Sequence, residues 1–141
     1  MGIVTAAVPQ EVRARLAPLL GQTEREALER MRVVTGAPGR WLPPLLRTTA
    51  TTLGRYVLFR LDRYDPASPR GLALLAHEAV HVRDYERLGV ARFLARYGRG
   101  LLAARFVHDR HPMEQEAIAV RRRVRRALEE AAPDANREAR E

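Results

Sequence analysis

The chain has 141 residues, which is enough for one domain with a modest core and too few for two. It contains no Cys, so disulfides, thiolate zinc ligands and a Cys nucleophile are excluded. The formal net charge is +8, and all 25 basic residues are Arg. This Lys-free composition resembles the codon bias of a GC-rich genome more than selection for a partner. A basic surface would attract nucleic acid, but no nucleic-acid-binding motif accompanies the charge, so nucleic acid is a disfavoured partner.

The sequence gives no sign of membrane insertion or export. Residues 1–22 have neither a basic start nor a long apolar core, so we expect no signal peptide. No run of eighteen apolar residues exists, and we therefore expect no membrane span. A cytoplasmic location is the default expectation, while oligomeric state and export route leave no trace in the sequence.

The N-terminal part of the chain predicts two short helices and a strand. Apolar residues recur at helical spacing over 9–20 and again over 22–32. Thr23 followed by Glu26 has the spacing of a capping box, which predicts a fresh helix start there. The short β-branched run 31–35 predicts a strand.

The next segment predicts a helix and a second strand. The Pro43-Pro44 pair could open a helix over 41–52, which Gly54 would end. Residues 56–61 predict a strand, in which successive side chains would point to opposite faces. We expect one of these faces to be buried. If that strand is an exposed edge, it could bind an extended peptide by strand addition.

The C-terminal half predicts helices throughout. Ser68-Pro69 and Gly89 bound a helix over 69–88. Two more helices follow over 90–97 and 100–110, hinged at Gly98-Arg99-Gly100, and a last helix runs over 112–131. Residues 132–141 are polar, with Pro133 breaking the helix, and predict a disordered tail. We therefore predict an α+β fold that is mostly helical. A small two-stranded or short sheet should pack on the helix 69–88, and a single domain should cover 1–131.

The helix 69–88 carries a His-Glu-x-x-His motif at His77, Glu78 and His81. Residues four apart lie on the same face of a helix, so the two imidazoles could bind one metal ion. Glu78 is rotated by about 100 degrees from His77 and could reach a metal-bound water. Zinc hydrolases need this set: two neutral nitrogen ligands, a third ligand, an open position for water, and a carboxylate that accepts the water's proton.

The third ligand is open on spacing alone. Because the chain has no Cys, the candidates are the other His residues and the carboxylates. Glu114 and Glu116 lie in the first turn of the last helix, where the helix dipole favours a carboxylate. His111 is a further candidate, and the apolar stripe of the helix favours Glu114 only slightly.

Three motifs in order resemble those of the gluzincin metallopeptidases. They are Thr52-x-Gly54-x-x-Val57-x-Phe59, Leu74-Leu75-Ala76-His77-Glu78-x-x-His81-Val82 and Pro112-Met113-Glu114-Gln115-Glu116-Ala117. Within that group, the chain is most similar to the small His-Glu-x-x-His domain associated with extracellular contractile injection systems, and its size and layout resemble the minimal gluzincins. The resemblance covers roughly residues 31–120 and implies a zincin-like fold, with this stretch as its core.

The resemblance also implies the ligand set and the activity. In such families the third ligand is a Glu three residues before a small residue, which corresponds to Glu114 before Ala117. It implies Zn²⁺ held by His77, His81 and Glu114, with Glu78 activating a zinc-bound water to hydrolyse a peptide or protein substrate. An oxyanion donor could be Tyr97, His108 or His111.

Two other points qualify the expected site. Relatives often carry a Gln-containing polar segment after the second His, whereas this chain has Arg83-Asp84-Tyr85-Glu86-Arg87. Asp84 could orient His81 or, as the favoured alternative, pair with an Arg on the surface. The alternative function is a zinc-stabilised interaction or targeting domain with little or no peptidase activity, and a basic nucleic-acid binder ranks below both.

Overall fold

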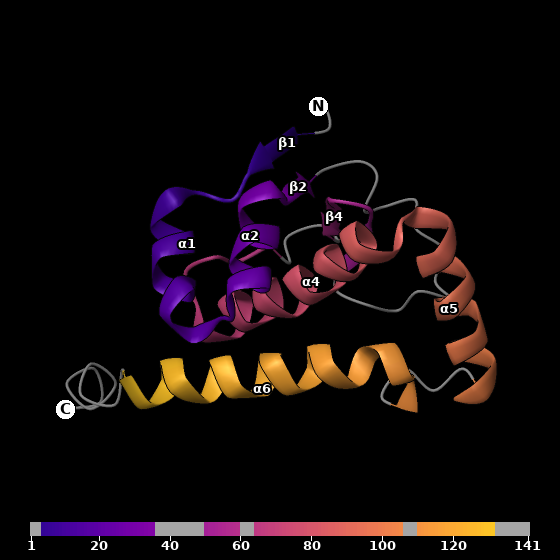
Figure 1. Cartoon of the computed structure of the whole chain (residues 1–141). Helices are drawn as coiled ribbons and strands as arrows, with labels where there is room; N and C mark the ends of the chain where they lie inside the picture. Colours follow the sequence, from indigo (N-terminus) through magenta and orange to yellow (C-terminus); the bar gives the residue numbers. More distant parts are fainter. Residues whose placement is uncertain (1–3, 36–49, 60–63, 106–109, 132–141) are drawn as a thin grey trace.

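The computed structural model describes residues 4–35, 50–59, 64–105 and 110–131. A small sheet and two short helices lie on one side of the long helix α4 (Pro69–Leu88). The long helix α6 (Pro112–Ala131) runs along the opposite side of α4 (Figure 1). The helix that carries the His-Glu-x-x-His motif is therefore central to the fold, and the predicted mostly helical α+β class is confirmed.

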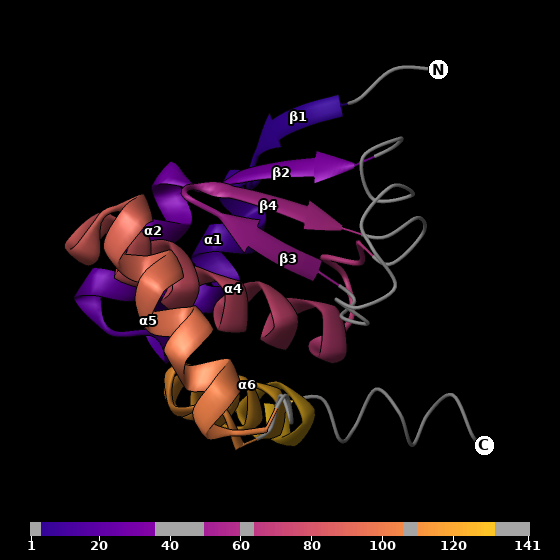
Figure 2. The ribbon, with the colours of Figure 1, turned by 90° about the vertical axis from the view of Figure 1, so that its right-hand side faces the viewer.

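The sheet has four strands in the order β1-β2-β4-β3 (Figure 2). The strands are β1 (Val4–Ala7), β2 (Arg32–Thr35), β3 (Ala50–Leu53) and β4 (Tyr56–Phe59). The central pair β2 and β4 is parallel, and both outer strands pair antiparallel to their neighbours. Because β4 lies inside the sheet, the expectation that residues 56–61 could form an exposed edge is wrong for the described residues 56–59. Strand β3 occupies the position beside α4 instead.

Two strands depart from the sequence expectation. Residues 50–52 were expected at the end of a helix over 41–52 but belong to β3, and the earlier part of that helix lies outside the described residues. Gly54 adopts a φ of 63° and turns β3 into β4, so it makes a hairpin and does not end a helix. Strand β1 was not predicted, because all four of its residues are exposed and show no alternation.

The helix α4 begins and ends at the predicted residues. The Ser68 side chain accepts a hydrogen bond from the amide of Gly71, and Pro69 takes the first helical position. Gly89, with a φ of 81°, ends the helix. Nearly every residue from Leu72 to Val82 is buried, since the sheet, α2 and α6 all pack against this helix.

The remaining helices mostly follow the prediction. They are α1 (Gln10–Leu16), a 3₁₀ turn η1 (Ala17–Leu19), α2 (Gln22–Arg30) and α5 (Val90–Ala103), and α6 has the predicted bounds. The prediction of a capping box at Thr23 was wrong. The helix α2 begins after Gly21, and the Thr23 hydroxyl donates to the Glu24 carboxylate within the first turn. The hinge was also wrong, because α5 continues through Gly98 and Gly100. The tail 132–141 lies outside the described residues.

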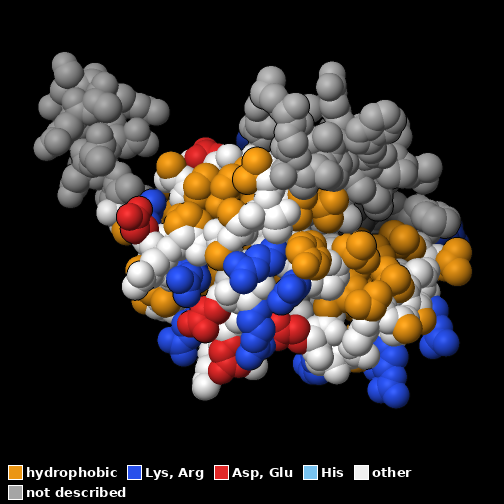
Figure 3. All heavy atoms as spheres, turned by 90° about the horizontal axis from the view of Figure 1, so that it is seen from above, with side chains coloured by type: hydrophobic (Ala, Val, Ile, Leu, Met, Phe, Trp, Pro, Cys, Tyr) orange, Lys and Arg blue, Asp and Glu red, His pale blue; other side chains and the backbone are white. Residues whose placement is uncertain are grey.

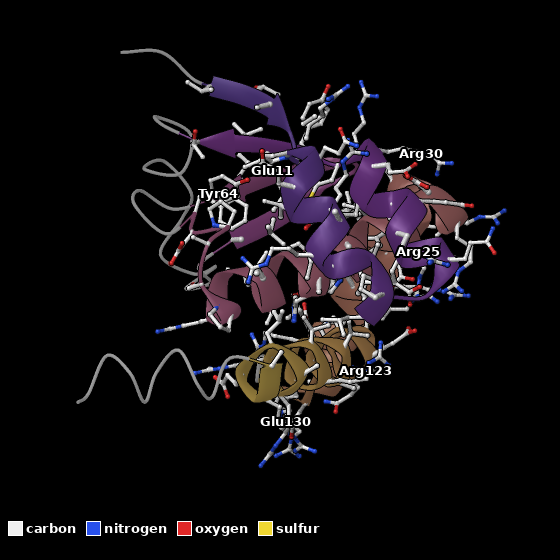
Figure 4. The ribbon with its side chains drawn as sticks, turned by 90° about the vertical axis from the view of Figure 1, so that its left-hand side faces the viewer. Glu11, Arg25, Arg30, Tyr64, Arg123 and Glu130 are labelled. Atoms are coloured by element: carbon white, nitrogen blue, oxygen red, sulfur yellow. The ribbon has the colours of Figure 1, made fainter. Side chains whose placement is uncertain are left out.

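One hydrophobic core joins the sheet and helices around α4. It includes Leu16, Leu28 and Met31 from the N-terminal part, and Val57 and Phe59 from β4. Tyr64 packs at its edge, with its ring 5.0 Å from that of Phe59 (Figure 4). Within the described ranges, no helix is both long and apolar enough to cross a lipid bilayer.

The N-cap of α4 predicts a stability effect. Replacing Ser68 by Ala removes the acceptor for the Gly71 amide and should lower the free energy of unfolding by about 1 kcal/mol. Chemical denaturation measures the loss, with Ser68→Thr as the control that keeps the hydroxyl. Equal unfolding midpoints for Ser68→Ala and the unaltered protein would show that the cap contributes nothing.

Candidate metal centre

The two motif histidines converge on one carboxylate. From α4, Nε2 of His77 lies 3.0 Å and Nε2 of His81 lies 3.1 Å from Oε2 of Glu114, which comes from the first turn of α6. The two imidazole rings have centroids 5.0 Å apart. All three side chains are buried, with residue exposures of 2–5%. Of the three residues considered as a third ligand, Glu114 is the one that the fold brings to the imidazoles.

The geometry of this cluster fits a metal ion. One ligand atom from each residue can be chosen so that all three lie within 4.8 Å of one another. In a tetrahedral zinc site with bonds of about 2.0–2.1 Å, ligand atoms are about 3.3 Å apart. The observed separations of 3.0 Å and 3.1 Å need to open by only a few tenths of an ångström. Imidazole nitrogen and carboxylate oxygen are also ligands that zinc accepts.

The charges around His81 show why this arrangement would benefit from a cation. Burial by itself would lower the pKa of His81, but the hydrogen bond to Glu114 and the charges of Glu78, Glu114 and Asp84 together raise it. Three acidic groups thus act on one buried imidazole. A divalent cation in this cluster would offset the same negative charge.

The carboxylate of Glu78 is held by the edge of the sheet. The hydroxyl of Thr52 in β3 donates to Oε2 of Glu78 at 2.5 Å. The backbone carbonyl of Thr52 in turn accepts a hydrogen bond from the Tyr85 hydroxyl, 3.2 Å away on α4. These two bonds fasten β3 to the motif helix. The sequence showed Thr52 only as part of a weak motif and gave no reason to pair it with Glu78.

Glu116, the second candidate on α6, forms an ion pair with Arg83. Its two oxygens accept hydrogen bonds from Nη1 and Nη2 of Arg83 at 2.9 Å and 2.6 Å, and its side chain is 57% exposed. The Arg83 guanidinium lowers the pKa of Glu116. Arg83 also pairs with Glu24 of α2 and with Asp84, so it ties three helices together. Glu116 therefore serves as an ion-pair partner on the outside of α6.

The imidazole of His111 forms hydrogen bonds with backbone groups. It is fully buried, its Nε2 donates to the carbonyl of Tyr97 at 2.7 Å, and its Nδ1 accepts from the amide of Met113 at 3.1 Å. Both ring nitrogens are thus engaged, and the second bond satisfies an amide in the first turn of α6. The expectation that His111 could be a ligand or an oxyanion donor is not supported by these contacts, and His108 lies outside the described residues.

Two further side chains near the cluster have defined partners. The Tyr97 hydroxyl donates to Oε1 of Glu114 at 3.0 Å, and burial followed by the charge of Glu114 raises the pKa of Tyr97. Asp84 accepts hydrogen bonds from Arg83 and Arg87, so the expected pairing with Arg is confirmed, but Asp84 is buried and does not lie on the surface. Tyr97, considered for an oxyanion, instead supports a candidate ligand in this arrangement.

Gly100 is a residue whose importance the sequence did not reveal. A Cβ at this position would lie 2.3 Å from Cε1 of His111, so only glycine lets the imidazole pack against α5. The spacing of Gly98 and Gly100 looked like a hinge, because a sequence pattern cannot distinguish a flexible glycine from one that makes room for a neighbour.

Arginine side chains on the described surface are interspersed with acidic ones. Figure 3 shows blue and red side chains side by side on the face viewed from above. Ion pairs join Arg30 to Glu86 and Arg125 to Glu129. Figure 4 shows Arg25 and Arg30 on the outer side of α2. Some of the Arg side chains are thus paired locally with carboxylates.

A comparison with known protein families gives one match. The family model described as the eCIS core domain matches residues 7–89, more than half of the chain. The match includes α1, α2, the strands β2, β3 and β4 and the complete His-Glu-x-x-His motif, and it ends before α5 and α6. No curated protein and no solved structure matches.

The close approach at Gly100 predicts a matched pair of variants. In Gly100→Ala the new methyl group collides with a buried imidazole that two hydrogen bonds hold in place, so we expect destabilisation by about 1–3 kcal/mol. Gly98→Ala meets no atom within 4 Å and should stabilise the helix by about 0.5–1 kcal/mol. Thermal unfolding compares the two, and equal melting temperatures would contradict the packing role of Gly100.

Proposed function

This chain belongs to the eCIS core domain family, and from that membership and the geometry of the metal cluster we propose that it is a zinc-dependent metallopeptidase of the gluzincin type. The observation that carries the proposal is the convergence of both motif imidazoles on Oε2 of Glu114. It joins the two helices α4 and α6 through His81 and Glu114, which are 33 residues apart in sequence, at the position where a third ligand is required. The family's description associates the protein with extracellular contractile injection systems, so its partners would belong to such a system.

The proposed ligands are His77, His81 and Glu114, and the proposed metal is zinc. A bound zinc ion would supply a Lewis acid that acidifies a coordinated water to a pKa of about 7 and polarises a substrate carbonyl. The absence of Cys restricts the ligands to nitrogen and oxygen donors. Such a set, with one position left for water, is typical of catalytic zinc sites.

Glu78 is the proposed general base. The Thr52 hydroxyl donates to Oε2 of Glu78. We therefore expect the other oxygen of this carboxylate to take part in proton transfer. Glu78 would accept a proton from the attacking water as the new C–O bond forms at the scissile carbonyl. It would then give this proton to the amine nitrogen as the C–N bond breaks, which returns the carboxylate to its starting state.

Metal binding is the first test of the proposal. The purified protein should bind one zinc ion, and a saturating metal concentration of 100 times Kd should add about 2.7 kcal/mol to its free energy of unfolding. Glu114→Gln and His81→Ala should lose most of this affinity, whereas Glu116→Gln, which changes a carboxylate paired with Arg83, should retain it. Metal analysis and melting curves with and without a chelator provide the measurement. A melting temperature that the chelator does not change, together with strongly salt-dependent binding to nucleic acid, would favour the nucleic-acid alternative.

Peptide cleavage is the second test. Glu78→Gln keeps the size of the side chain but cannot accept the water's proton, so it should bind zinc normally and lose cleavage of a peptide library by at least about 100-fold. Mass spectrometry of the products identifies cleaved bonds. Undiminished hydrolysis by Glu78→Gln would rule out the proposed role of this residue.

A second candidate is a zinc-stabilised interaction domain without peptidase activity. The burial of the cluster favours it, since Glu78 has an exposure of 4% and the three proposed ligands 2–5%. This alternative predicts chelator-sensitive melting with no cleavage of any library peptide by the unaltered protein. The two assays together therefore separate an enzyme from a structural zinc domain.

A further inference from the structure

The two oxygens of Glu114 are divided between two sets of partners. Oε2 faces the imidazoles of His77 and His81, and Oε1 accepts the hydrogen bond of the Tyr97 hydroxyl at 3.0 Å. A carboxylate without such a bond can rotate and offer either oxygen, or both, to a metal. The Tyr97 hydroxyl favours one orientation of Glu114 before any ion arrives.

The ring of Tyr97 is itself held firmly. It stacks on the imidazole of His111 with centroids 4.1 Å apart and lies nearly parallel to Phe93 at 5.8 Å. The carbonyl of Tyr97 accepts from Nε2 of His111, and Gly100 gives that imidazole the space to approach α5. Phe93, Gly100 and His111 therefore position the hydroxyl of Tyr97. We refer to Phe93, Tyr97, Gly100 and His111 as the tyrosine support.

We propose that Tyr97 is a positioning residue that presents Glu114 to a metal through Oε2, and that metal binding at the cluster is linked to the docking of α5. The proposal rests on the metal site put forward above. Hydrogen-bond partners of metal ligands reduce the freedom that the ligand must lose on binding, and their removal typically costs about 10–100-fold in metal affinity. Tyr97 would act through Glu114 without contacting the ion.

The link to α5 follows from how this helix is attached. Among its own residues, only Phe93 and Gly100 are buried, while Val90, Leu94 and Leu102 are exposed. Phe93 stacks on Tyr85 of α4 at 3.6 Å and lies edge-on to His81 at 6.2 Å, and Tyr97 adds the hydrogen bond to Glu114 of α6. If a docked α5 favours metal binding, a bound metal must favour a docked α5 by the same free energy.

Zinc affinity of Tyr97→Phe tests the positioning role. Phenylalanine keeps the stacked ring and removes only the hydroxyl, so competition with a chromogenic chelator should show a 10–100-fold weaker Kd. The control is Tyr85→Phe, which loses a hydroxyl bonded to the Thr52 carbonyl and should leave zinc affinity unchanged. A lower melting temperature of the metal-free Tyr97→Phe protein with unchanged zinc affinity would mean a merely structural hydroxyl and would overturn the proposal.

Amide hydrogen exchange tests the link to α5. In the unaltered protein, zinc should slow exchange in α5, and Tyr97→Phe at saturating zinc should lose at least half of that added protection. Equal protection of α5 in both proteins would overturn the link. The outcomes also separate this inference from the proposed function. If the unaltered protein binds no zinc, the metal site fails and this inference with it, whereas tight zinc binding that Tyr97→Phe leaves unchanged overturns only the inference.

Discussion

Oxygen Oε2 of Glu114 lies 3.0 Å and 3.1 Å from the imidazole nitrogens of His77 and His81, and all three side chains are buried. Burying a carboxylate is costly unless its charge is compensated. The carboxylate of Glu114 is buried where α6 packs against the motif on α4. Hydroxyl groups of Thr52 and Tyr97 compensate part of this cost by donating to Glu78 and Glu114. These polar contacts lie within an otherwise apolar core, which is typical of a functional site and not of simple packing.

The register between α4 and α6 decides whether the cluster exists. Arg83 follows His81 by two residues, and Glu116 follows Glu114 by two, so their bidentate pair lies beside the cluster on the same two helices. The fork of a guanidinium matches a carboxylate in one orientation. Because Glu24 of α2 binds the same guanidinium, the pair also relates α6 to the N-terminal helices. Because Glu116 is exposed, its pair with Arg83 contributes little to stability, whereas the pair of Arg83 with Glu24 is largely buried.

Local patterns predicted the parts of the fold that local chemistry determines. Ser68, Pro69 and Gly89 bound α4 because capping depends on neighbours in sequence. The same reasoning could not place β1, whose exposed residues form a strand only because β2 pairs with them. Of the cluster, the motif itself was plain in the sequence, whereas the choice among Glu114, Glu116 and His111 depended on distances between helices. Spacing on α6 separated Glu114 from Glu116 poorly, and the Arg83 pair that occupies Glu116 comes from another helix.

The family match covers only some of the residues that form the cluster. The matched residues 7–89 contain three of the four strands and the motif helix, and thus Thr52, the two imidazoles and the carboxylate of Glu78. The third candidate ligand, Glu114, comes from α6 and its support from α5, both outside the match. A His pair by itself binds zinc weakly, since a stable site needs a third protein ligand. The helices beyond the matched region therefore supply both the third candidate ligand and the tyrosine that hydrogen-bonds to it.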